Sequence, residues 1–246
     1  MLSIRQFCGS RSPRSVICSN DLNSIMFANL LARFGISQSR IEPSRWVVLD
    51  VETTGLDPSR DRLLAIAAIA IEVGPGFTKP TIVIGDSFEA VLKQDLASDK
   101  DNILVHHIGV GAQTAGRPPV EVLEDFRQWV GSSPLLAFHA PFDQGMITRA
   151  YKRFGLSPLA NDWIDIEPLA AVSGIHPKAR ALDDWLQLFG IECSVRHQAA
   201  ADTLATCELL LCLWNSIRKE AKSLAELKNL PKRGPGFPER KLNFTN

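Results

Sequence analysis

Two apolar runs rich in β-branched residues, 46–51 and 63–71, restrict the possible folds of this chain more than any other feature. Runs of this kind and length are typical of buried β-strands. The residues between them, 53–58, contain a glycine and a proline and indicate a turn. The sequence therefore predicts a fold built on a sheet that contains these two buried strands.

The remaining segments alternate between strand and helix patterns. A third strand is predicted over 81–92, with an interruption or bulge near Gly85, and residues 112–119 are expected to form a loop. A short buried strand is predicted at 135–138, and helices are predicted at about 120–129, 143–154, 178–189 and 198–217. This order predicts an α/β layered fold with a mixed sheet.

The two ends of the chain differ in composition from this central pattern, which we assign to residues 45–216. Residues 1–44 form an accessory segment in which a helix is expected to begin at Asp21 and stop at Gly35. The first 20 residues carry three arginines and no acid, a composition that suits either a transit peptide or a disordered bacterial N-terminus. Residues 217–246 gather lysines and arginines around Gly-Pro turns and predict a mobile basic arm.

The overall composition limits the kinds of partner and cellular compartment that suit this protein. Lys and Arg together number 27, as do Asp and Glu, so the chain has no global positive field and any phosphate binding has to be local. The sequence has no apolar run long enough to cross a bilayer, and we expect no membrane association. Its five cysteines form no C-x-x-C pair, which favours reduced thiols and a cytoplasmic location in a bacterium.

The first group of residues suited to catalysis is Asp50-Val51-Glu52, at the end of the first predicted strand. The strand period of two places both carboxylates on one face, where two like charges favour a cation between them. The triplet alone is weak evidence, because Asp165-Ile166-Glu167 is a second one and a solvated strand end is the alternative. The first triplet is distinguished by the Thr53-Thr54-Gly55-Leu56 segment after it, whose glycine permits a close turn of the backbone around a ligand.

Two further acids lie at predicted helix starts. The segment 138–143 leads from a strand through a proline turn to Asp143, although helix capping alone would also explain an acid there. His197 and Asp202 are separated by about 500° on a helix, so we expect His197 to precede the helix and to reach over its first turn. Asp202 lies on the stripe of Leu209 and Leu213 that faces the sheet, where a carboxylate needs a metal or a hydrogen-bond donor.

Together, these three segments resemble the exonuclease motifs of the DnaQ-like, or DEDDh, superfamily of 3′→5′ exonucleases, over about residues 45–216. This superfamily includes the proofreading epsilon subunit of the bacterial replicative DNA polymerase. The first and third segments match in residue type and spacing. The second has Phe138-His139-Ala140 where many members have His-Asn-Ala before the Phe-Asp pair. The histidine at 197 selects the DEDDh subfamily, because the sister group has a tyrosine four residues before the last acid, where this chain has Gln198.

The resemblance implies an RNase H-like fold, with a mixed β-sheet flanked by helices, and hydrolysis of terminal phosphodiesters of DNA or RNA to nucleoside 5′-monophosphates. It implies two divalent cations, Mg²⁺ or Mn²⁺, held by Asp50, Glu52, Asp143 and Asp202, with His197 as the general base. The expected partners are the 3′ end of a nucleic acid, taken to be single-stranded, and a DNA polymerase; the oligomeric state is left open. The residues expected to contact the substrate are Thr53, Thr54, Gly55, Leu56, His139 and Phe142.

Two other functions compete with this hypothesis. A catalytically weak RNase H-like module that binds nucleic acid or associates with a polymerase is disfavoured, because every presumed ligand is present. A metal-binding regulatory domain would require the three motifs to have converged by accident. Of the remaining polar residues, His106 and His107 are expected to form a structural turn, and the spacing of four tryptophans predicts core positions, at Trp129, Trp163, Trp185 and Trp214.

Overall fold

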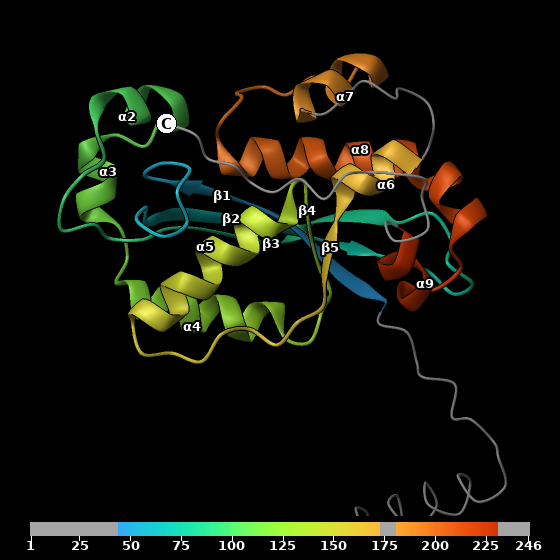
Figure 1. Cartoon of the computed structure of the whole chain (residues 1–246), viewed down its shortest axis with the longest axis horizontal. Coiled ribbons are helices and arrows are strands. Elements are labelled where there is room, and N and C mark those ends of the chain that lie inside the picture. The colour runs from blue at the N-terminus through green and yellow to red at the C-terminus, as the bar shows by residue number, and fades with distance from the viewer. Residues whose placement is uncertain (1–43, 173–180, 231–246) are drawn as a thin grey trace, which may run out of the picture. The chain divides into compact units, whose positions relative to one another are not determined.

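The two apolar runs form adjacent antiparallel strands, β1 (Arg45–Thr53) and β2 (Leu63–Glu72). On the far side of β2 lies the antiparallel β3 (Thr81–Val91), and on the far side of β1 the parallel strands β4 (Leu135–Ala137) and β5 (Trp163–Asp165) follow. The sheet thus has the order β3-β2-β1-β4-β5 and is mixed, as predicted (Figure 1). The computed structural model describes residues 44–172 and 181–230, which belong to one compact unit.

Helices cover both faces of this sheet (Figure 1). One core cluster joins the sheet to α4 and α5, and a second joins the opposite face to α6, α7, α8 and α9. The bounds of the described helices are α2 (Lys100–His106), α3 (Val110–Ala115), α4 (Pro119–Val130), α5 (Ala140–Arg153), α6 (Ile166–Val172), α7 (Leu182–Phe189), α8 (Ala199–Glu220) and α9 (Leu224–Asn229).

The alternation of side chains along β1 determines which face carries the first acids. Val47 and Leu49 pack in the cluster under α4 and α5, whereas Trp46 and Val48 pack in the cluster under α8. Since successive side chains point to opposite faces, Asp50 and Glu52 continue the row of Trp46 and Val48. Burial of both faces also explains why the run is apolar throughout.

The third strand is bulged where the sequence predicted an interruption. In its pairing with β2, Ser87 lies opposite Ile69 and Val83 lies opposite Ala70, so the segment around Gly85 is skipped. The long predicted helices at 120–129, 143–154 and 198–217 are confirmed as α4, α5 and α8, within a few residues at each end.

The segment 100–119 differs from the prediction. The expected loop at 112–119 is wrong at its start, because α3 extends to Ala115, and α2 was not predicted. The residues that α2 and α3 bury are polar, His106 and Gln113, so no apolar period marks either helix. His106 has the expected structural role: its Nε2 lies 2.8 Å from Asn102 Oδ1, and its Nδ1 accepts the backbone N–H of Ile108 at 2.9 Å.

The structure corrects the C-terminal boundary that was set at residue 216. Helix α8 runs to Glu220 and α9 follows it, with buried apolar side chains that join the α8 core cluster at Ile217, Ala221, Leu224, Leu227 and Leu230. Residues 217–230 are therefore part of the packed fold and not of a mobile arm. The remaining basic tail, 231–246, and the helix expected at 21–35 lie outside the described residues. In the described ranges, no helix combines the length and apolar character needed to span a bilayer.

Candidate active site

Four carboxylates from three separate elements converge beside the end of β1. Asp50 and Glu52 come from the strand, Asp143 from the first turn of α5, and Asp202 from the first turn of α8. Asp50 is close enough to Asp202 and to Asp143 for their charges to interact, and Glu52 is likewise near Asp50 and Asp202. The structure thus brings together all four acids that the sequence singled out.

Burial and repulsion by neighbouring carboxylates oppose ionisation of Asp50, Glu52 and Asp143. The pKa of Asp50 is raised to about 8, first by burial and then by the charge of Asp202. Burial, followed by Asp50 and Asp202, raises the pKa of Glu52 to about 9. For Asp143 the pKa is also well above its usual value, because of burial and the nearby Asp50. Such a cluster is stabilised when a cation shares its charge.

The start of α5 is held by residues whose role the sequence did not reveal. His139 precedes the helix in a left-handed conformation, with φ of 65°. Its backbone N–H donates to Asp165 Oδ1 at 3.0 Å, and its Nδ1 lies 2.9 Å from Glu167 Oε2. The second Asp-x-Glu triplet, to which the sequence assigned no role, thereby holds the turn that positions Asp143. Asp165 also lies close enough to Asp143 to contribute to its raised pKa.

The segment before α8 carries His197, as predicted, outside the helix. His197 is exposed and has φ of 59°, and its backbone N–H donates to Asp202 Oδ2 at 3.0 Å. On its other oxygen Asp202 is contacted by the Arg196 guanidinium, which also pairs with Asp183 of α7, and by Cys193 Sγ at 3.3 Å. The sequence did not predict that Arg196 and Cys193 contact Asp202. The one local signal for this contact was the position of the basic residue Arg196 directly before His197.

The segment Thr53–Gly55 belongs to a turn organised by Asp61. The Asp61 carboxylate accepts hydrogen bonds from Thr54 Oγ1 at 3.1 Å and from the Asp57 N–H at 2.8 Å. A Cβ at Gly55 would lie 2.5 Å from Asp61 Oδ2, so the glycine makes room for this carboxylate, whereas the sequence suggested room for a ligand. The hydroxyl of Thr53 donates to Gly55 O at 2.7 Å.

Two apolar residues expected to contact the substrate differ in exposure. Leu56 is 70% exposed at the tip of this turn and is available for contact. Phe142 is partly buried and packs against the α4–α5 core cluster. The side chains of Thr53 and Thr54 already have partners within the turn, so their hydroxyls have a structural role.

The chemistry of this donor set fits hard divalent cations. All four acids supply oxygen ligands, and burial followed by the charge of neighbouring carboxylates raises the pKa values of Asp50, Glu52 and Asp143. In the part of the chain that the structure describes, no three His, Cys, Asp or Glu side chains are arranged closely enough to hold a metal as they stand. The Arg196 guanidinium contacts Asp202 and lowers the pKa values of Asp50 and Glu52, so a cationic group is already present at the cluster. A bound cation would take over this neutralising role.

The chain is similar in sequence to known exonuclease domains. The model of an exonuclease family, RNase_T, matches residues 47–210. The PolC-type DNA polymerase III of Staphylococcus epidermidis is 30% identical over 171 residues, which cover 70% of this chain and 11% of that protein. The corresponding polymerase of Staphylococcus aureus is 29% identical over 171 residues, with the same coverage. The chain thus spans about a tenth of the length of these relatives.

Solved structures share the fold. Exonuclease I of E. coli in complex with a dT13 oligonucleotide superimposes with a TM-score of 0.61 and 20% identity, over 72% of this chain and 42% of that one. The zinc-bound complex of the same enzyme with single-stranded DNA gives a TM-score of 0.60 and 20% identity, over 72% and 43% of the two chains. The mixed sheet flanked by helices is therefore the RNase H-like fold that the sequence motifs implied.

Proposed function

The chain belongs to the exonuclease family, and we propose that it removes nucleotides from the 3′ end of DNA or RNA as nucleoside 5′-monophosphates. Family membership and fold make it a DnaQ-like nuclease. The observation that carries the finer proposal is the convergence of Asp50, Glu52, Asp143 and Asp202 beside the end of β1. Four carboxylates in this environment repel one another and a phosphodiester alike, so activity requires cations.

We assign the four acids to two cation sites, taken up by Mg²⁺ or Mn²⁺. Asp50, Glu52 and Asp202 would hold one ion, and Asp50 and Asp143 the other. Bound there, the ions would supply Lewis-acid activation of water and neutralise the charge on the leaving 3′ oxygen. The zinc-bound exonuclease I complex supports a divalent cation as cofactor.

His197 is the proposed general base. Its neutral imidazole would accept the proton of the attacking water, a role that histidine fills more often than any other side chain. The left-handed backbone at this residue and the hydrogen bond from its N–H to Asp202 fix the start of the side chain relative to the acids. Arg196 would have to leave Asp202 for that carboxylate to bind a cation.

The proposed substrate is a single-stranded 3′ end. Exonuclease I, which shares the fold, has been crystallised with single-stranded DNA, and the staphylococcal relatives are DNA polymerases. Association with a polymerase is thus a further proposal. Leu56, exposed at the tip of the turn after β1, is the residue we expect to contact the terminal base.

The deciding experiment is digestion of oligonucleotides that carry a 5′ label. With Mg²⁺ or Mn²⁺ the label should pass through a ladder of products shortened from the 3′ end, and excess EDTA should stop the reaction. The same assay with single-stranded DNA, single-stranded RNA and duplex substrates would identify the preferred substrate. Tight binding without shortening would favour a catalytically weak binding module, and shortening in excess EDTA would contradict the metal requirement.

A further inference from the structure

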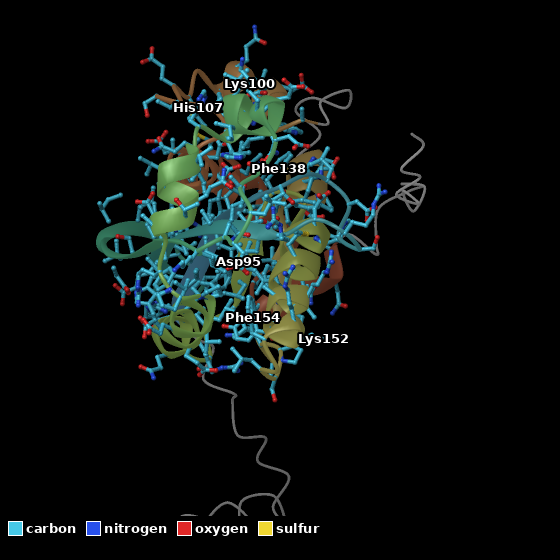
Figure 2. All side chains as sticks on the ribbon, turned by 90° about the vertical axis from the view of Figure 1, so that its left-hand side faces the viewer. Asp95, Lys100, His107, Phe138, Lys152 and Phe154 are labelled. Carbon is cyan, nitrogen blue, oxygen red and sulfur yellow. The ribbon has the colours of Figure 1, made fainter. Side chains whose placement is uncertain are left out.

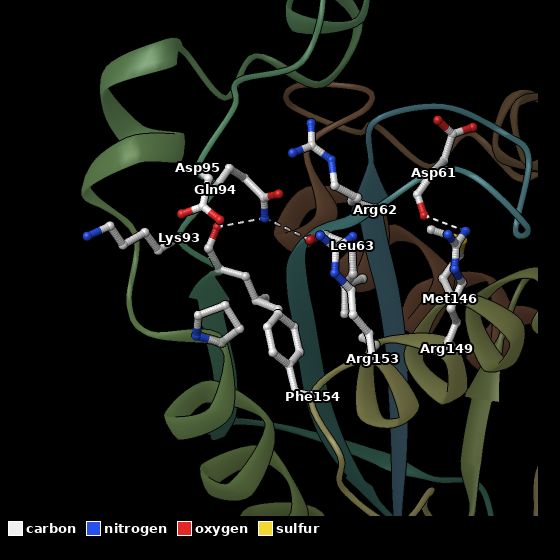
Figure 3. Close-up of a pocket in the computed structure, with 13 residues that line it drawn as sticks. Asp61, Arg62, Leu63, Lys93, Gln94, Asp95, Met146, Arg149, Arg153 and Phe154 are labelled. Atoms are coloured by element: carbon white, nitrogen blue, oxygen red, sulfur yellow. Dashed lines mark hydrogen bonds between the residues drawn. The ribbon is translucent and has the colours of Figure 1, made fainter.

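A basic cavity lies outside the acid cluster, between the start of β2, the segment after β3 and the second half of α5. It has a volume of about 230 Å³, and its lining includes Arg62, Lys93, Arg149 and Arg153. In Figure 3, Lys93 lies on one side of the cavity and Arg149 on the other, with Arg62 and Arg153 between them. Figure 2 shows Asp95, Phe154 and Lys152 on the same face of the molecule. We call this feature the basic cavity.

The four cationic side chains of the basic cavity form no ion pairs with the described carboxylates, unlike many other cationic side chains of the protein. Within residues 44–172 and 181–230, none of the four lies within ion-pair distance of a carboxylate. Six others are paired with an acid, namely Arg45, Arg60, Arg117, Arg127, Arg196 and Lys228. Since the whole chain has no net charge, this clustering of uncompensated cations is a local positive field.

Two carboxylates also line the basic cavity, and they reduce its charge without cancelling it. Asp61 uses both of its oxygens as acceptors within the turn after β1, and Asp95 is exposed. An aromatic ring completes the lining: Phe154 is 37% exposed, and the Arg153 guanidinium carbon lies 6.0 Å from its ring centroid. Cations beside an exposed aromatic ring are the combination that binds phosphates together with bases.

Arg149 connects the basic cavity to the catalytic strand. Its Nη1 donates to Pro58 O at 2.7 Å and to Asp61 O at 2.9 Å, in the turn that directly follows Glu52. Helix α5 carries Asp143 at its start and Arg153 at its end. At about 1.5 Å per residue these two positions are about 15 Å apart, roughly the length of four stacked nucleotides at about 3.4 Å each.

We propose that the basic cavity binds the phosphodiester backbone of a single strand, a few nucleotides on the 5′ side of the end that lies at the acid cluster. This inference rests on the proposed function for the direction of the strand. Arg62, Lys93 and Arg153 contact phosphates, Phe154 stacks on a base, and Arg149 keeps the cavity in place relative to the turn after β1. The cavity supplies the local phosphate binding that a chain without net charge requires.

Binding measured without cleavage tests the proposal. Fluorescence anisotropy of a 5′-fluorescein dT12 strand is followed at several salt concentrations, with Ca²⁺ in place of Mg²⁺ so that the strand is not consumed. Lys93→Gln/Arg153→Gln should weaken binding about tenfold and make the slope of log K against log salt shallower by about 1.4, since each phosphate contact contributes about 0.7. The matched control is Arg218→Gln/Lys219→Gln, which removes two exposed cations at the end of α8 and should bind as the parent does.

Three outcomes separate this inference from the proposed function. Unchanged affinity and slope in the Lys93/Arg153 variant overturn the basic cavity as a strand site, even if the parent digests DNA. A weakened variant supports it, even if no digestion is seen. Binding of an oligoglutamate of equal charge as tightly as dT12 overturns the assignment to nucleic acid and indicates an acidic protein instead. In active protein, kcat/KM of the variant should fall more for a twelve-nucleotide strand than for a dinucleotide.

Discussion

At the scale of single residues, the acid cluster destabilises the protein when no cation is bound. The folded-state pKa values of Asp50 and Glu52, about 8 and about 9, lie above their ordinary values of 3.8 and 4.5. The folded protein therefore holds protons that the unfolded chain releases near pH 4. It follows that the free energy of unfolding in EDTA should fall as the pH rises from about 4 to about 9.

Asp50→Asn should remove part of this pH dependence. In EDTA at pH 9 we expect the variant to be more stable than the parent by on the order of 2 kcal/mol, because one of the repelling charges is gone. Urea unfolding between pH 5 and pH 9 measures the difference, and Asp101→Asn, at an exposed position on α2, is the control. A less stable Asp50 variant at pH 9 would contradict the electrostatic interpretation.

His197→Ala should lower the rate without loss of cation binding. A general base contributes about 10² to 10⁴-fold and acts only when it is unprotonated, so the variant should be slower by this factor and should lose any base-dependent rise of the rate with pH that the parent shows. Single-turnover rates at saturating Mn²⁺ from about pH 6 to 9 measure it, with Mn²⁺ binding followed by electron paramagnetic resonance. His107→Asn, at an exposed left-handed position, is the control. Parallel pH profiles would exclude His197 as the base.

Arg196→Gln should make cation binding tighter. The guanidinium contacts Asp202 and lowers the pKa values of Asp50 and Glu52, so it competes with a divalent cation for the same negative charge. An ion-pair energy of about 1 kcal/mol corresponds to roughly fivefold in the Mn²⁺ dissociation constant. Isothermal titration at pH 9 measures this constant, with Arg117→Gln as a paired but distant control. Equal or weaker binding would show that Arg196 supports the site instead.

At the scale of elements, the turn between β1 and β2 determines the position of the acids on β1. Gly55→Ala would place a Cβ 2.5 Å from Asp61 Oδ2 and so displace a carboxylate that holds Thr54 and Asp57. We expect a loss of about 1 to 3 kcal/mol in stability and at least tenfold in kcat/KM. Gly109→Ala, where a Cβ meets no atom within 4 Å, is the matched control for thermal unfolding and activity. If both variants behaved like the parent, Asp61 would not organise the turn.

At the scale of the whole molecule, the segment after Ser216 completes the core. Removing residues from 217 onward would delete Ile217, Leu224, Leu227 and Leu230, all buried in the α8 core cluster. Each large apolar side chain contributes about 2 to 5 kcal/mol, so the loss approaches the whole stability of a typical domain. A chain that ends at Ser216 should fail to give a cooperative unfolding transition by circular dichroism. A chain that ends at Leu230, which keeps every described contact, should unfold cooperatively.

Local patterns in the sequence were sufficient to predict the elements that are marked by a long apolar run or an apolar stripe. The continuous apolar runs of β1 and β2 and the apolar stripe of α8 can each be recognised locally, and the acids at the end of β1 and the start of α8 follow directly from that placement. Motif spacing then identified Asp50, Glu52, Asp143, Asp202 and His197 as one group.

Tertiary contacts determine which other residues meet these acids. Arg196 reaches Asp202 from the segment before α8, and Asp165 of β5 holds the turn that carries His139. The helices α2 and α9 were missed as well: α2 buries only a polar residue, and α9 is too short for a period. In each case the interaction joins segments that are far apart in the sequence or depends on a single side chain. A local periodicity in the sequence therefore cannot predict it. The basic cavity is the largest example, because the turn before β2, the segment after β3 and α5 each supply its cations, and only folding brings them to one surface.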